Sequence, residues 1–263
     1  MIKVSVIIIN YNTFQLTCDC LKSVIDQTQD VAYEIIVVDN ASTECPAALF
    51  KDRFPAIRLI ESKENLGFSK GNNLGIAQAK GEYILLLNSD TELKNNAIKI
   101  VSGFLQSHPS FGAASAKLIS EDGSVQSCCQ KFPGVLPRLL EFSRLHKLMP
   151  ASRRAHLFYG AYFDHQTYAE PDWIWGTFFM FPKSLLGSLE HKQLDDSFFM
   201  YMEDMTWCYD IRKLGLNIAY LPEAVVMHHM GGSSGGKSDF MRQNYNAFLK
   251  KNYTLIEYLL LKQ

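Results

Sequence analysis

The sequence lacks several features that would assign a function at once. No apolar run within the 263 residues approaches the length that spans a bilayer. The N-terminus has no basic segment followed by a long apolar stretch, so we expect no signal peptide. No GxGxxG pattern follows the first expected strand, which weakens the case for a Rossmann dinucleotide site, and we expect no P-loop.

A strong net charge and paired cysteines are also missing. The formal net charge is −1, so nothing global favours a nucleic acid partner. The six cysteines form no CxxC pair and no Cys/His zinc spacing, which indicates reduced thiols in a cytoplasmic protein. The length fits one large α/β domain that can bury a sizeable core.

Apolar runs alternate with helical periods in the first half of the chain. Strands are expected at 4–9, 33–38, 57–60 and 83–87. Helices are expected at 16–25, around 47–54 and from 65 to about 79. Short connections between strands and helices indicate βαβ units and a mostly parallel sheet.

Polar residues follow three of these strands, at 10–12, 39–42 and 88–90. Such positions converge on one crevice in an open parallel sheet. Tyr11 could stack on a base, and Asp39 could accept hydrogen bonds from a base or ribose. Alternatively, Tyr11 is an aromatic residue at the edge of the core and Asp39 is a cap.

The stretch 65–73 combines glycines with a lysine. Gly67 and Gly71 would let the backbone approach a phosphate, and Lys70 could offset the phosphate charge. Alternatively, both glycines only form turns.

The segment Asn88-Ser89-Asp90 ends the strongest apolar run. A carboxylate flanked by amide and hydroxyl oxygens suits a hard divalent cation that carries phosphates. Alternatively, it is an Asx-type turn in which Asp90 caps a helix beginning near Leu93.

The second half begins with an expected strand at 111–119 and a hairpin at 121–124. The insertion 133–170 then mixes basic and apolar residues, such as Arg138, Arg144 and Phe142. It is either a solvated helix packed on the domain or a contact with an anionic membrane surface or a lipid-linked substrate.

The aromatic run 172–181 is expected to be a strand. Trp175 and Gly176 suggest an aromatic platform with close backbone approach for a carbohydrate; the alternative is a core strand with a bulge.

Three further side chains are candidates for chemistry. Glu203 and Asp204 begin an expected helix, whose dipole would stabilise them and keep a general base ionised. His228 ends a strand and could be a metal ligand beside a carboxylate. The tail 245–261 is expected to be one helix.

Seven segments occur together in a characteristic order over residues 1–240: VSVIIINYNT, VVDNAS, ENLGFSKGNNLG, LLLNSDTEL, WIWGTFFMF, FFMYMEDMTWC and HHMGGSS. With them the chain resembles the inverting glycosyltransferases of family two, which have the GT-A fold, and within them the rhamnosyltransferase-like branch.

The resemblance implies roles for these residues. Asp90 and His228 would hold Mn²⁺ or Mg²⁺, Asp204 would be the base with Glu203 beside it, and Trp175 and Gly176 would contact the acceptor. The residues implied to bind the nucleotide-sugar are Asn10, Tyr11, Asn12, Asp39, Asn40, Asn65, Gly67, Lys70, Gly71, Asn72, Asn88, Ser89 and Asp90. Two positions depart from the family pattern: Asn88 replaces the first acid of DxD, and Thr206 replaces the second Asp of EDxD.

The resemblance also implies the organisation. A single GT-A domain, a Rossmann-like mostly parallel sheet flanked by helices, would span 1–263. Its nucleotide-sugar half would be 1–110, its acceptor-side half 111–240, and its C-terminal helix 241–263.

The implied reaction is inverting transfer of a sugar from a nucleoside-diphosphate sugar to a glycan hydroxyl. The best match is rhamnose from dTDP-rhamnose, with a polyprenyl-linked polysaccharide or O-antigen precursor as acceptor, in the cytoplasm or on the cytoplasmic face of the inner membrane. The alternatives are a nucleotidyltransferase that makes a sugar nucleotide, and a catalytically silent glycan-binding module.

Overall fold

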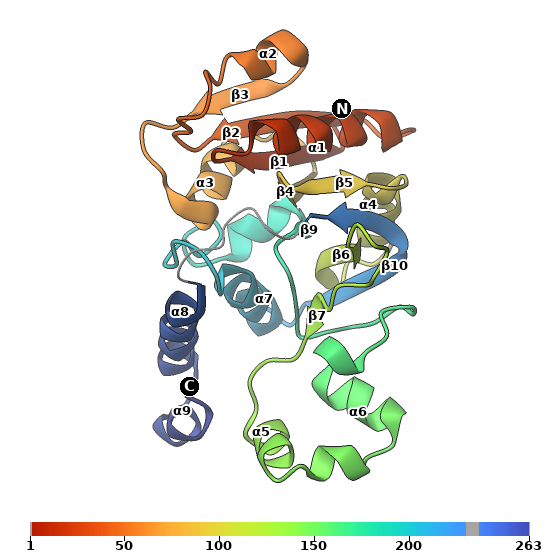
Figure 1. Ribbon diagram of the computed structural model, residues 1–263, viewed down its shortest axis with the longest axis vertical. Helices are drawn as coiled ribbons and strands as arrows, with labels where there is room; N and C mark the ends of the chain where they lie inside the picture. The colour runs from red at the N-terminus through yellow and green to blue at the C-terminus, as the bar shows by residue number, and fades with distance from the viewer. Residues whose placement is uncertain (1, 230–236, 263) are drawn as a thin grey trace.

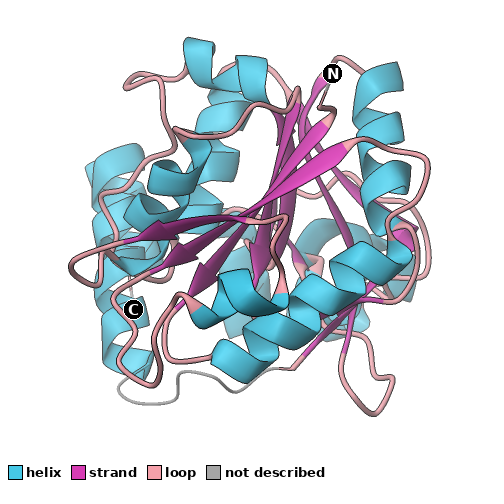
Figure 2. Ribbon diagram, turned by 90° about the horizontal axis from the view of Figure 1, so that it is seen from above, coloured by secondary structure: helices cyan, strands magenta, loops and turns pink. Residues whose placement is uncertain are grey.

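The computed structural model describes residues 2–229 and 237–262. Within these residues, eight strands form one twisted sheet with helices on both faces (Figures 1 and 2). The strands run in the order β3-β2-β1-β4-β9-β6-β10-β5. Their bounds are β1 Val4–Asn10, β2 Tyr33–Asp39, β3 Arg58–Glu61, β4 Tyr83–Asn88, β5 Thr91–Leu93, β6 Phe111–Ile119, β9 Phe178–Pro182 and β10 Asn217–His228.

The sheet is mostly parallel, as the sequence predicts. β9 is antiparallel to both β4 and β6, and β5 is antiparallel to β10. The strands β1 and β4 are almost wholly buried because both faces of the sheet are covered. Successive side chains point to opposite faces, so Val6 enters one core and Ile7 the other.

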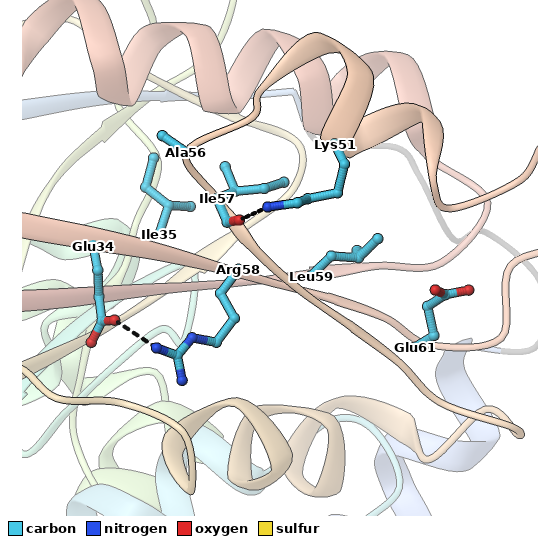
Figure 3. A pocket seen from close by; sticks show the side chains of 8 residues that line it. All are labelled: Glu34, Ile35, Lys51, Ala56, Ile57, Arg58, Leu59 and Glu61. Carbon is cyan, nitrogen blue, oxygen red and sulfur yellow. Dashed lines mark hydrogen bonds and ion pairs between the residues drawn. The ribbon is translucent and has the colours of Figure 1, made fainter.

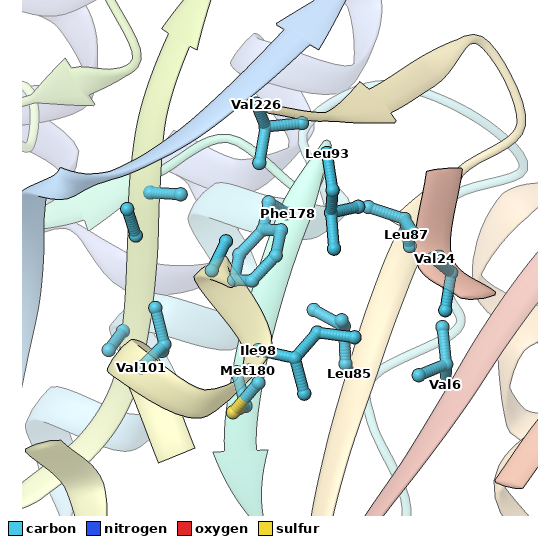
Figure 4. Close-up of a cluster of buried hydrophobic side chains, with 14 of the residues drawn as sticks. Val6, Val24, Leu85, Leu87, Leu93, Ile98, Val101, Phe178, Met180 and Val226 are labelled. Carbon is cyan, nitrogen blue, oxygen red and sulfur yellow. The ribbon is translucent and has the colours of Figure 1, made fainter. Parts of the chain in front are cut away.

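Two hydrophobic cores hold the layers together. On one face, α1 (Phe14–Gln27) and α4 (Ala97–Ser107) supply Val24, Ile98 and Val101 to the core drawn in Figure 4. On the other face, α3 (Gly67–Ile76) and α7 (Glu203–Lys213) supply Ile76, Trp207 and Ile211. The short helix α2 (Leu49–Arg53) precedes β3. This packing fixes the strand ends on which the site is built.

Three expected elements differ from the structure. Leu93 ends the short strand β5, and the next helix begins only at Ala97, because 91–93 pairs with β10. The aromatic run is divided into β8 (Trp173–Ile174), which pairs with β7 (Cys129–Gln130), and β9, with a turn between them. The tail forms two helices, α8 (Lys237–Asn252) and α9 (Leu255–Leu261), because Thr254 and Glu257 form a capping box that starts a new helix.

The insertion extends from the lower part of the domain in Figure 1. It consists of α5 (Val135–Phe142), the 3-10 turn η1 (Leu145–Leu148), α6 (Ala151–Phe158) and the 3-10 turn η2 (Gly160–Tyr162). A third 3-10 turn, η3 (Lys183–Ser188), follows β9. Among residues 2–229 and 237–262, no helix has the length and apolarity needed to cross a membrane.

Candidate active site

The ends of β1, β2 and β4 form a row of polar side chains, as the sequence predicts. The strand registers place Asn10 beside Asp39, and Ile9 beside Asn88. Nδ2 of Asn10 donates to Oδ1 of Asp39 at 2.7 Å. The second oxygen of Asp39 accepts from the backbone N–H of Ser42 at 3.2 Å. Both Asp39 oxygens therefore already have protein partners.

The predicted residues Tyr11, Asn12 and Ser89 lie around this row. Tyr11 is half exposed at the rim. Oδ1 of Asn12 accepts from the backbone N–H groups of Thr43 and Glu44, which fixes the loop after β2. Oγ of Ser89 lies 3.1 Å from Oγ1 of Thr13 and so links the end of β4 to the start of α1.

Asn40 organises the segment that enters α3. Its Nδ2 donates to Oδ1 of Asn65 at 2.9 Å and to the carbonyl oxygen of Gly67 at 3.1 Å. Gly67 has φ +75°, and a Cβ there would lie 2.3 Å from the carbonyl oxygen of Phe199. The missing side chain at this position therefore makes room for the backbone of Phe199, and the predicted approach of a phosphate to Gly67 stays a prediction.

The other predicted residues of α3 divide between its two faces. The Cβ position of Gly71 faces Ile9, so this glycine also packs protein against protein. Asn72 is buried and donates to the carbonyl oxygen of Phe68. Lys70 is exposed, so its charge is accessible to a ligand.

Asp90 and His228 meet although they lie 138 positions apart in the chain. Oδ1 of Asp90 lies 3.5 Å from Nε2 of His228. Nδ1 of His228 lies 2.8 Å from Oε1 of Gln126, an oxygen that can only accept. In the neutral ring the proton is therefore on Nδ1, which leaves a lone pair on Nε2 directed to Asp90. Gln126 was not found from the sequence, because it lies in a loop without any motif.

This pair fits a divalent cation. A carboxylate oxygen and an imidazole lone pair converge, and Oδ1 of Asn88 is buried without a hydrogen-bond partner among the described residues. Burial alone would raise the pKa of Asp90. The hydrogen bond and charge of His228 in its protonated form, a backbone hydrogen bond and the charge of His229 together outweigh burial and lower that pKa. Asp90 is thus ionised at neutral pH, as a metal ligand must be.

The neighbouring His229 supports Asp90. Its backbone N–H donates to the carbonyl oxygen of Asp90 at 2.9 Å. Its ring lies between Glu121 (2.6 Å) and Glu92 (2.9 Å). Burial lowers the pKa of His229, but the two carboxylates outweigh burial and raise it. His229 therefore connects Glu92 of β5, Glu121 and the backbone of Asp90 at this end of the site.

Glu203 and Asp204 begin α7, as predicted, but their ionisation differs from the expectation. Burial raises the pKa of Asp204 to about 6, although the backbone N–H groups of Met205 and Gly176 oppose the shift. Burial and the nearby charge of Asp204 raise the pKa of Glu203 to about 8. Oε2 of Glu203 has no hydrogen-bond partner among the described residues. The helix N-terminus favours ionised carboxylates, as the sequence indicated, but burial opposes it at both positions and more strongly at Glu203.

The turn between β8 and β9 connects the two parts of the site. The backbone N–H of Gly176 donates to Oδ2 of Asp204 at 3.2 Å. The carbonyl oxygen of Thr177, the next residue, accepts from the backbone N–H of Asn88 at 3.0 Å. Gly176 and Thr177 thus place the Asp204 carboxylate beside the end of β4, and the predicted contact of Gly176 with a carbohydrate stays a prediction. Trp175 is partly buried and packs against the first core.

Thr206, which occupies the position of the missing acid, has a structural role. Its hydroxyl donates to the carbonyl oxygen of Met202 at 2.8 Å, and the side chain is buried. Met202 has φ 75° and the preceding Tyr201 has φ 68°, both in the left-handed region. Thr206 thus stabilises the unusual backbone immediately before Glu203.

Two other features lie outside this site. A hollow of about 580 Å³ is lined by residues of β2 and β3, the segment before β3 and Lys51 of α2. Within it Arg58 pairs with Glu34, and Lys51 donates to the carbonyl oxygen of Ile57 (Figure 3). No predicted site residue lines it. The expectation of no P-loop needs a correction, since residues 231–238 read GGSSGGKS and match the spacing GxxxxGK[ST]. Residues 230–236, which also contain the end of the HHMGGSS segment, lie outside the described residues.

Comparison with known proteins gives a consistent result. Residues 5–189 match the family described as Glycosyl transferase family 2. The N-acetylglucosaminyl-diphospho-decaprenol L-rhamnosyltransferase of Mycobacterium tuberculosis is 25% identical over 217 residues, which cover 76% of this chain and 68% of the relative. S. aureus TarS 1–349 superposes with a TM-score of 0.60 at 18% identity, covering 98% of this chain and 68% of TarS. GalNAc-T7 with UDP, GalNAc and Mn²⁺ superposes with a TM-score of 0.67 at 15% identity, covering 95% of this chain and 48% of GalNAc-T7.

Proposed function

Because the chain belongs to glycosyl transferase family 2 and has the predicted GT-A fold, we propose that it is a metal-dependent inverting hexosyltransferase. The donor is a nucleoside-diphosphate sugar, and the acceptor is a hydroxyl of a glycan. The observation that carries the proposal is the turn 175–177, through which Gly176 contacts Asp204 and Thr177 contacts Asn88. It brings a carboxylate with a raised pKa next to the strand end that carries Asp90.

Asp204 and the Asp90–His228 pair have different roles in the proposed reaction. Asp204 accepts the proton of the acceptor hydroxyl while Gly176 holds its second oxygen. The acceptor oxygen then bonds to the anomeric carbon from the face opposite the diphosphate, the bond from that carbon to the diphosphate oxygen breaks, and the nucleoside diphosphate leaves. A cation held by Asp90 and His228 would stabilise the negative charge on the leaving diphosphate. No covalent intermediate is required, and the anomeric configuration inverts.

The donor proposed is dTDP-rhamnose and the acceptor a polyprenyl-diphosphate-linked glycan. The support is the name of the mycobacterial relative, which is a rhamnosyltransferase with a decaprenol-linked substrate, together with the branch-level resemblance of the motifs. Such an acceptor would place the enzyme at the cytoplasmic face of a membrane. Among the metals, Mn²⁺ is supported by the GalNAc-T7 structure. Mg²⁺ suits the carboxylate oxygen of Asp90 and the diphosphate of the donor.

Product analysis tests the donor. The protein is incubated with Mn²⁺, a lipid-linked N-acetylglucosamine acceptor and either dTDP-rhamnose or a UDP-hexose. We expect a product with one added deoxyhexose of inverted configuration. Transfer from the UDP-hexose and none from dTDP-rhamnose would reject rhamnose, and transfer from neither, despite binding of both nucleotides, would reject the transferase activity on this acceptor.

A further inference from the structure

The most exposed apolar side chains gather on two segments. On α5 and η1 these are Leu136, Leu139, Phe142, Leu145 and Leu148, and Phe142 reaches 89% exposure. On α9 they are Leu255, Ile256, Leu259 and Leu260, with 72% exposure for both Leu255 and Ile256. All nine are at least half exposed, whereas every other large apolar side chain of the described residues is less exposed than that. A distribution this uneven marks an interaction surface.

The two segments are neighbours in space although more than a hundred residues separate them. α5 contacts α9 directly, and both lie at the lower end of the molecule in Figure 1. Val135, at the start of α5, packs against the cluster that contains the buried Leu261 of α9. We call the exposed apolar residues of α5, η1 and α9 the apolar footprint.

The chain around the apolar footprint is strongly basic. Residues 133–162 contain five Lys or Arg against one acid, and residues 240–262 contain four against one. Together these segments carry +7, so the rest of the chain carries −8 of the formal total of −1. Arg138, Arg144 and Lys147, which lie in the same segment as the apolar side chains of α5 and η1, are exposed, and so is Arg153 of α6.

We propose that the apolar footprint is a membrane-binding surface that seats on anionic lipid. Short amphipathic helices with exposed Leu and Phe and flanking Arg and Lys bind at the boundary between headgroups and acyl chains. Basic residues near the surface add attraction to anionic headgroups. A second copy of this chain is a less favourable partner for the apolar footprint, because a symmetric contact would bring together two surfaces that each carry a formal charge of +7.

The position of the apolar footprint relative to the candidate active site indicates a function for membrane binding. The cluster that buries Leu261 also contains Met205, which directly follows Asp204. The start of α7 and the footprint helix α9 therefore share one hydrophobic cluster. If the proposed function holds, this arrangement presents Asp204 to a glycan whose polyprenyl anchor lies in the same bilayer.

Vesicle binding tests the inference without donor or acceptor. The full chain is sedimented with sucrose-loaded vesicles of phosphatidylcholine alone or of phosphatidylcholine mixed with anionic phosphatidylglycerol. We expect binding only to the anionic vesicles, with at least about tenfold weaker binding at 0.5 M salt.

Matched variants identify the surface. Arg144→Glu with Lys147→Glu, and separately Leu255→Ser with Ile256→Ser, should each weaken vesicle binding at least about tenfold. The controls are Lys63→Glu with Lys80→Glu, and Ile25→Ser with Leu49→Ser; they make equal changes at exposed positions outside the footprint and should bind as wild type does.

Several outcomes would overturn the inference. The wild-type protein would fail to bind anionic vesicles or would bind neutral vesicles equally well. Alternatively, the α9 variant would bind vesicles as tightly as wild type, or the protein would form a dimer that the footprint variants dissociate. Transfer to a short soluble acceptor is measured in parallel. Vesicle binding without transfer would reject the proposed function but not the membrane-binding surface. Transfer without vesicle binding would reject the membrane-binding surface but not the proposed function.

Discussion

Asn244 on α8 donates from Nδ2 to the carbonyl oxygen of Tyr201 at 3.1 Å and to that of Met200 at 2.9 Å. Tyr201 and Met202 have left-handed backbone angles and immediately precede Glu203. Helix α8 thus holds the strained turn from which the candidate base projects.

Replacing Asn244 by Ala removes both hydrogen bonds. We expect the free energy of unfolding to fall by about 1–3 kcal/mol and kcat to fall while the KM for the donor changes little, because the donor side of the site is untouched. Denaturant unfolding and steady-state kinetics measure the two effects. The control is Gln243→Ala, an exposed neighbour on α8; an Asn244 variant that matches this control would show that the turn holds its shape without α8.

Asp90→Ala tests the cation site. Removing the carboxylate leaves His228 as the other ligand of the pair, so binding of a nucleoside diphosphate should no longer be strengthened by Mn²⁺. Isothermal titration with and without Mn²⁺ measures this difference. Asp26→Ala removes an exposed carboxylate on α1 and serves as control. Unchanged Mn²⁺-dependent binding in the Asp90 variant would place the cation elsewhere.

The row of strand ends was predictable because its cause is local. Val4 to Ile9 and Leu85 to Leu87 are apolar runs buried on both faces of a sheet, so the positions of Asn10, Asp39 and Asn88 follow from where these runs stop. Parallel strands then bring their carboxyl ends to one edge.

The remaining parts of the site depend on contacts between distant segments. Gln126 meets His228 across 102 residues, and no local pattern marks it. The strand at Leu93 exists because β10 pairs with it, where local signals favoured a helix. The raised pKa values at 203–204 arise from burial by other parts of the chain, whereas the sequence shows only the helix N-terminus.

Asp204→Asn should lower turnover by roughly 10² or more, the scale of general-base catalysis, and leave donor binding nearly unchanged. The wild-type rate should also fall as the pH drops through about 6, since burial raises the pKa of Asp204 to that value and the protonated acid cannot accept a proton. Rates and donor titrations at several pH values measure both effects. Near-normal turnover in the variant would move the base role away from Asp204.

Replacing Glu203, which is next to Asp204, by Gln distinguishes an effect of this carboxyl on stability from an effect on catalysis. Burial raises the folded-state pKa of Glu203 from 4.5 to about 8. Between these two pH values the unfolded chain has lost this proton and the folded protein still holds it, so this residue makes the protein less stable as the pH rises. Gln cannot ionise. We therefore expect the variant to be close to wild type near pH 5 and to be more stable near pH 8, on the order of 4 kcal/mol.

Thermal unfolding at the two pH values measures this difference, and Glu64→Gln at an exposed position is the control. Turnover at pH 7 should stay near wild type, because Glu203 is already neutral there while Asp204 is ionised. An equal stability difference at both pH values would mean that Glu203 ionises normally. A loss of turnover as large as that of Asp204→Asn would mean that its proton or charge takes part in the reaction.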